Sequence, residues 1–125
     1  MKVMPLLGAL VLLGVIANMA LGFASEAGYA SLVMVHMGIG YLGLLLVLVA
    51  AVMGWQRRGK VPTRNILAMT VVLVLAIVQV YLGSQLLESS SQTLLLAHEA
   101  NAFLLLAGVL VTAALTARRQ AAPKP

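Results

Sequence analysis

The chain has 125 residues, of which 62% are hydrophobic and 9% are charged, whereas a soluble domain is about 45–50% apolar and about 25% charged. A chain of this length has no interior large enough to bury so much apolar surface, so the composition excludes a soluble globular domain and indicates that lipid is the solvent. The absence of cysteine excludes disulfides, thiolate metal sites and thiol nucleophiles.

The apolar residues fall into four segments, each long enough to cross a hydrocarbon core as a helix, which takes roughly 20 residues. The segments lie at about residues 4–24, 30–55, 65–87 and 93–117. None alternates apolar and polar residues as the strands of a transmembrane barrel do, and helices satisfy their own backbone hydrogen bonds in lipid. The sequence therefore predicts an all-α integral membrane protein with four transmembrane helices.

The two ends of the chain are expected to differ. The first apolar segment follows Met1 and Lys2 as in a signal peptide, but it is longer than the apolar region of about 7–15 residues that a signal peptide has. We therefore expect a retained helix. Residues 120–125 contain two prolines and no apolar run, so we expect a disordered cytoplasmic tail after one bundle domain of residues 1–119.

Short connections join the four predicted helices, at residues 25–29, 56–64 and 88–92. Loops of this length make consecutive helices antiparallel neighbours. The sequence therefore predicts an up-down-up-down four-helix bundle.

The charged residues are divided between the two ends of the predicted helices. The three acids, Glu26, Glu88 and Glu99, lie toward one side. The basic residues lie toward the other side: Lys2, Arg57, Arg58, Lys60, Arg64, Arg118, Arg119 and Lys124. Because positively charged loops stay in the cytoplasm, we expect a multi-pass protein of a prokaryotic plasma membrane with both termini cytoplasmic. The same rule explains the net charge of +5 without a nucleic acid partner, and some affinity for anionic lipid headgroups would follow.

The two halves of the chain resemble each other. The matches, at offsets of 61 or 62 residues, are Asn18 with Gln79, Gly22 with Gly83, His36 with His98, and Arg57 with Arg118. Both halves are expected to enter the membrane from the same side, so we interpret the bundle as two parallel two-helix repeats related by an axis along the membrane normal.

The repeat places the only two histidines of the chain, His36 and His98, at one depth near the outer ends of the second and fourth predicted helices. An ionisable side chain in a spanning segment indicates a functional site; the structural alternative is a hydrogen bond between helices. A zinc site is disfavoured, because zinc takes three or four protein ligands and the chain offers two histidines. Glu99, beside His98, points to another side of the helix and is a poor third ligand. Haem needs only an axial pair, so the sequence predicts one haem iron held by His36 and His98 in the bundle core.

Small residues follow both histidines on the same helical faces, namely Gly40 and Gly43 after His36 and Ala102 after His98. They are candidate haem-binding residues because they leave room for a flat macrocycle, although small residues also serve ordinary helix packing. The outer half of the chain has no Lys or Arg to pair with haem propionates. The polar candidates there are Ser31, Tyr81, Ser84, Gln85 and Asn101.

These features resemble one half of a haem A synthase. That family has two four-helix repeats, each with a histidine near the outer ends of its second and fourth helices, and compact archaeal members have one such unit. The stretch from Gln79 to Gly83 is similar to the family's third-helix pattern. The resemblance implies that His36 and His98 are haem ligands. Catalytic members have a glutamate and often an arginine around the first histidine, where this chain has Val33 and Met37, and many have an outer cysteine pair that this chain lacks.

The residues leave three functions open. The first is a membrane b-type cytochrome that exchanges electrons with a redox partner protein or a quinol through haem b. The second, implied by the resemblance, is a compact haem A synthase-like oxidoreductase that acts on haem O to give haem A. The third is a structural or pigment-binding small subunit of a larger membrane complex. Chlorophyll magnesium takes one axial ligand, so two histidines at one depth favour a single shared haem, and we expect the cytochrome.

Overall fold

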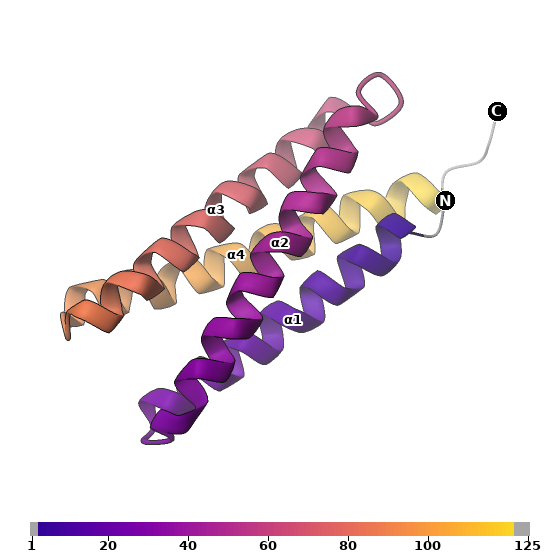
Figure 1. Ribbon diagram of the computed structural model, residues 1–125. Coiled ribbons are helices and arrows are strands. Elements are labelled where there is room, and N and C mark those ends of the chain that lie inside the picture. The colour runs from indigo at the N-terminus through magenta and orange to yellow at the C-terminus, as the bar shows by residue number, and fades with distance from the viewer. Residues whose placement is uncertain (1–2, 122–125) are drawn as a thin grey trace.

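The computed structural model describes residues 3–121, which form four α-helices and one short 3-10 helix (Figure 1). The elements are α1 (Val3–Glu26), η1 (Ala30–Leu32), α2 (Val33–Gln56), α3 (Thr63–Glu88) and α4 (Gln92–Ala121). All four α-helices are long and apolar enough to cross a membrane. The prediction of an all-helical chain with four apolar helices is therefore confirmed.

Glycine, proline and serine determine where the helices begin and end. Gly28 and Gly59 have φ angles of +112° and +85°, a conformation that a residue with a Cβ rarely adopts, and they turn the chain after α1 and α2. Pro62 cannot donate a backbone hydrogen bond, and α3 begins directly after it. Ser91 Oγ accepts a hydrogen bond of 3.4 Å from the Leu94 N–H in the first turn of α4, as a helix N-cap does.

The last helix is longer than the sequence pattern predicted. α4 continues to Ala121, beyond the expected end near residue 117, because no glycine or proline follows Gly108 until Pro123. The helix therefore includes Gln120 and Ala121, which corrects the predicted start of the disordered tail. The rest of that tail, residues 122–125, lies outside the described residues.

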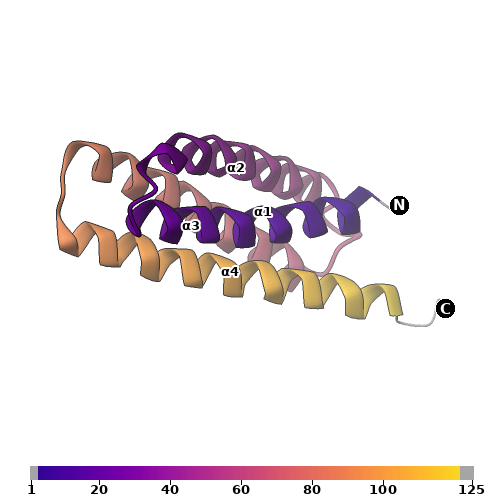
Figure 2. The same ribbon diagram turned by 90° about the horizontal axis from the view of Figure 1, so that it is seen from below.

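The helices form two hairpins, α1–α2 and α3–α4, that lie against each other. Each helix contacts two others, so that α1 and α3 are diagonal partners in the described chain, as are α2 and α4. The turns of both hairpins lie at one end of the molecule, here called the turn end, and the α2–α3 loop lies at the other, here called the loop end (Figures 1 and 2). The two hairpin turns stand apart from each other in both views.

The buried core extends from the middle of the helices toward the loop end. Its members are aliphatic side chains from all four helices: Val11, Val47, Ala51, Val72, Leu73, Ala76, Leu105 and Val109. Beyond it, Trp55 Nε1 donates a hydrogen bond of 3.0 Å to Thr70 Oγ1, which joins α2 to α3. Arg119 Nη2 donates one of 2.7 Å to the Lys60 carbonyl, which joins α4 to the α2–α3 loop. The helices are therefore fastened together at the loop end.

Large apolar side chains cover the outside of the bundle. Leu13, Met34 and Leu67 are 65%, 74% and 63% exposed, and many other aliphatic side chains share this position. Removing an aliphatic side chain from water is worth about 1.5–3 kcal/mol. The outer surface of the bundle is therefore far more compatible with lipid than with water.

Candidate functional site

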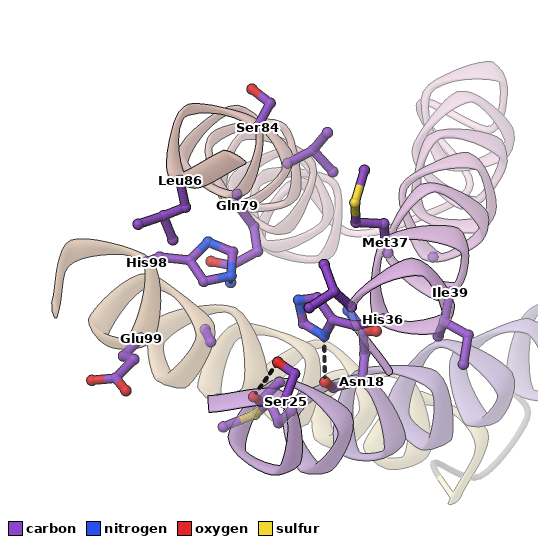
Figure 3. A pocket seen from close by; sticks show the side chains of 18 of the residues that line it. Asn18, Ser25, His36, Met37, Ile39, Gln79, Ser84, Leu86, His98 and Glu99 are labelled. Atoms are coloured by element: carbon purple, nitrogen blue, oxygen red, sulfur yellow. Dashed lines mark hydrogen bonds between the residues drawn. The ribbon is translucent and has the colours of Figure 1, made fainter. Parts of the chain in front are cut away.

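A cavity of about 560 Å³ lies between the helices on the turn-end side of the core. All four helices contribute to its walls, which are mainly apolar, and both histidines line it. The rings of His36 and His98 point into this space from α2 and α4, and Gln79 reaches toward them from α3 (Figure 3). Cofactor pockets of this kind usually measure about 300–1,000 Å³, so the cavity is large enough for a cofactor.

His36, in the first turn of α2, packs against α1 with the Cε1 side of its ring. A Cβ added to Gly22 of α1 would lie 3.1 Å from His36 Cε1, so only glycine leaves room for the ring at this position. His36 Nδ1 is 2.8 Å from the main-chain carbonyl of Asn18 and, because a carbonyl only accepts, Nδ1 donates. The proton is therefore on Nδ1 and the lone pair is on Nε2. This is the arrangement of a metal-ligating histidine, whose second nitrogen donates to a carbonyl.

His98, near the start of α4, repeats the same contact in the second hairpin. A Cβ added to Gly83 of α3 would lie 3.1 Å from His98 Cε1, the same distance as in the first hairpin. The polar partner differs, because the side-chain Nε2 of Gln79 donates to His98 Nε2 over 3.2 Å. His98 Nδ1 is buried and has no hydrogen-bond partner within the described chain.

The Gln79 amide is held in place by a second amide. Asn101 Nδ2 donates to Gln79 Oε1 over 2.6 Å and to the Leu75 carbonyl over 3.0 Å. Asn101 is only 7% exposed, so these bonds lie where water cannot replace them. Because Gln79 Oε1 accepts from Asn101, its NH2 group is the one that faces His98.

The two imidazoles lie opposite each other at the separation that a shared metal ion needs. Their ring centroids are 6.1 Å apart and their planes are inclined by 69°. Two imidazoles in line on one metal ion, with bonds of about 2.0–2.1 Å to nitrogens roughly 1.1 Å from each centroid, have centroids about 6.3 Å apart. The structure thus brings together the two histidines that the sequence placed at one depth.

The small residues predicted beside the histidines also line the cavity. Gly40, Gly43 and Ala102 all belong to its wall. A Cβ on Gly40 would lie 3.4 Å from Asn18 Nδ2, and one on Gly43 would meet nothing within 4 Å. Gly43 therefore borders open space in the cavity, whereas Gly40 accommodates a side chain of α1.

The turn-end side of the cavity is polar and acidic. Its hydroxyl, amide and carboxyl groups belong to Ser25, Glu26, Ser84, Ser89, Ser90, Ser91, Gln92 and Glu99. Partial burial and the neighbouring Glu99 carboxyl raise the pKa of Glu26, and Glu99 points away from the two rings (Figure 3). Among the described residues that line the cavity there is no Lys or Arg.

Only one of the polar residues predicted to meet haem propionates lies in the cavity wall. Ser84 lines the cavity, and its hydroxyl donates to the Tyr81 carbonyl over 2.7 Å. Asn101 is instead committed to Gln79 and Leu75, and Ser31, Tyr81 and Gln85 do not line the cavity. Val33 and Met37, apolar residues on either side of His36 in the sequence, do line it.

The sequence pattern did not identify four residues that touch or hold the histidines. Gly22 and Gly83 each pack against an imidazole, and Gln79 and Asn101 form the amide pair at His98. The repeat contained the signal for three of them, because Gly22, Gly83 and Gln79 are matched positions that precede the matched histidines. Asn101 has Ile39 as its counterpart and carried no such signal.

The donor set suits a macrocycle better than a bare metal ion. No group of three or more His, Asp or Glu side chains able to hold a metal ion occurs within residues 3–121, and zinc takes three or four protein ligands. Haem requires only two, and the paired imidazoles, the free Nε2 of His36 and the apolar cavity meet that requirement. Comparison with family models, with curated proteins and with solved structures finds no match to this chain, so the likeness to haem A synthases stays a prediction.

Proposed function

We propose that the protein is a membrane b-type cytochrome that holds one haem b between His36 and His98 and transfers electrons. The observation that carries this proposal is the pair of imidazoles 6.1 Å apart in the wall of a single cavity. Each ring packs against a glycine of the preceding helix at the same distance, so both repeats present an imidazole to the cavity in the same way.

The residues around the cavity would hold the cofactor in a water-poor site. When bound, haem supplies a one-electron iron couple whose potential depends on the axial ligands, burial and hydrogen bonds. His36 and His98 would fill both axial positions, which favours electron transfer over oxygen chemistry. The Asn18 carbonyl accepts the His36 Nδ1 proton and so keeps Nε2 available and the ring oriented.

The same proposal gives the bundle an orientation in the membrane. Arg57, Arg58, Lys60, Arg118 and Arg119 belong to the loop end, and positively charged ends face the cytoplasm. The bundle would therefore cross a prokaryotic plasma membrane up-down-up-down with its termini inside and the haem near the outer face. The electron partner would be a protein or a quinol that reaches the turn end.

The first experiment is a reduced-minus-oxidised absorption spectrum of the detergent-purified protein, followed by pigment extraction and mass measurement. We expect the sharp bands of a low-spin b-type cytochrome and one haem b per chain. A protein that stays colourless when haem is supplied would overturn the proposal and leave a structural subunit with two hydrogen-bonded histidines.

A second candidate is a haem A synthase-like oxidoreductase, favoured by the presence of Glu26 and Glu99 on the wall of the same cavity. These carboxyls are the only acidic groups among its described lining residues, since Val33 stands where the family has its glutamate. Expression together with haem O separates the two functions. Haem A in the extracted pigment supports the enzyme, and unchanged haem O supports the cytochrome.

A further inference from the structure

The two histidines of the site are held differently, although the repeat makes them equivalent. His36 is held through Nδ1 by a main-chain carbonyl, which leaves Nε2 without a hydrogen bond in the described chain. His98 is held through Nε2 by the Gln79 amide, so the nitrogen that would ligate a metal is already engaged.

The difference arises from one methylene group. Asn18, the counterpart of Gln79, has a shorter side chain, which lies beside Gly40 and leaves its Oδ1 without a partner. Gln79 is long enough to reach the imidazole, and Asn101 fixes its orientation through a bond of 2.6 Å. In the first repeat Ile39 occupies the position of Asn101. That repeat therefore lacks both a side chain long enough to reach the imidazole and an amide that would fix its orientation.

We propose that Gln79, anchored by Asn101, is a positioning residue that makes His98 the exchangeable ligand of the haem and His36 the permanent one. This inference rests on the proposed cytochrome function and assigns its site an additional property, reversible binding of a small neutral ligand on the His98 side. If haem is bound, a His98 Nε2 released from the iron would accept the Gln79 N–H that it accepts in the haem-free protein, and a small neutral ligand could replace it without any change of oxidation state.

The hydrogen bond at Gln79 lowers the cost of releasing His98. A released His36 Nε2 would stay without a partner in an apolar cavity, whereas a released His98 Nε2 is satisfied at once. One hydrogen bond between uncharged groups changes an equilibrium by roughly 2- to 12-fold. Release of His98 is favoured over release of His36 by about this factor.

The test uses Gln79→Leu, which removes the amide, and Gln85→Leu, the same change on the same helix at a residue that does not line the cavity. In the haem-free protein with 15N-labelled histidine, nuclear magnetic resonance reads the hydrogen bond at each Nε2 directly. We expect the two Nε2 resonances to differ in the wild type and Gln79→Leu to move the His98 resonance to the value of His36. Equal resonances in the wild type would overturn the inference.

In the reduced, haem-loaded protein, carbon monoxide is the probe of the exchangeable position. We expect Gln79→Leu to slow carbon monoxide binding roughly 2- to 12-fold, because His98 then leaves less readily, and Gln85→Leu to leave the rate unchanged. Asn101→Ile, which removes the anchor without touching His98, should slow binding in the same direction, and it replaces Gln79→Leu if that variant fails to fold.

The outcomes separate this inference from the function on which it rests. Haem binding in the wild type with a carbon monoxide rate that Gln79→Leu leaves unchanged or raises would overturn the inference and leave the cytochrome standing. A wild-type protein that binds no haem would overturn both.

Discussion

Replacing Gly22 by alanine tests whether the contact between glycine and imidazole serves a cofactor. The new Cβ would lie 3.1 Å from His36 Cε1, whereas carbon atoms in contact are normally about 3.5–4.0 Å apart. The ring would have to move by about 0.4 Å or more. It cannot do so freely, because its Nδ1 is bound to the Asn18 carbonyl at 2.8 Å.

The size of the effect follows from that hydrogen bond. Its loss costs about 0.5–1.5 kcal/mol, which is roughly a 2- to 12-fold weaker affinity for haem. The same substitution should stabilise the helix, because alanine is favoured over glycine in a helix interior by about 0.5–1 kcal/mol. The two effects on the haem-free protein have opposite signs and similar sizes, so we expect Gly22→Ala to bind haem more weakly while the unfolding temperature of the haem-free protein changes little.

The assay is a haem titration followed by absorbance, with thermal unfolding of the haem-free protein measured in parallel. Gly14→Ala is the matched control, since Gly14 lines the same cavity on the same helix and a Cβ there would meet nothing within 4 Å. Gly83→Ala should reproduce the Gly22→Ala loss in the second hairpin. Affinities of Gly22→Ala and Gly14→Ala that do not differ would refute the reasoning.

Three further predictions concern the cofactor, its charge environment and the membrane orientation. His36→Ala and His98→Ala should each remove most of the bound haem in a pyridine haemochrome assay, and full retention in both would exclude shared ligation. Glu26→Gln and Glu99→Gln should each raise the haem midpoint potential by on the order of tens of millivolts, because a nearby negative charge stabilises the oxidised iron; a redox titration that shows a fall would contradict this sign. A reporter domain fused after the C-terminus should be active only in the cytoplasm, and an external reporter would reverse the orientation.

The four helices were predictable because each apolar segment must satisfy its backbone internally in lipid, and nothing but a helix of roughly 20 residues does so in one segment. The meeting of His36 and His98 was predictable for a related reason. A repeat of 61 to 62 residues brings equivalent positions to the same depth, whatever the details of packing.

The contacts of the imidazoles were not predictable in the same way. Glycine in an apolar helix serves close packing in many ways, so Gly22 and Gly83 gave no sign that a histidine lies over each of them. The bond from Gln79 to His98 depends on a rotamer and on Asn101, which sits on another helix 22 residues away in the chain. The end of α4 was predicted too early. The apolar run stops near residue 117, but the residues that follow contain no helix breaker before Pro123, so the helix continues to Ala121.

The contacts at the loop end hold the two hairpins together at that end of the bundle. The core and the Arg119–Lys60 hydrogen bond can serve as a hinge, and beyond the cavity α1 and α4 meet again at Phe23 and Phe103, whose ring centroids are 6.4 Å apart. From Val47 in the core to His36 there are 11 residues, or about 16 Å of helix. A tilt of roughly 5° at the hinge would therefore separate the histidines by more than 1 Å over that length. The distance between the two imidazoles therefore depends on how closely the aliphatic core packs.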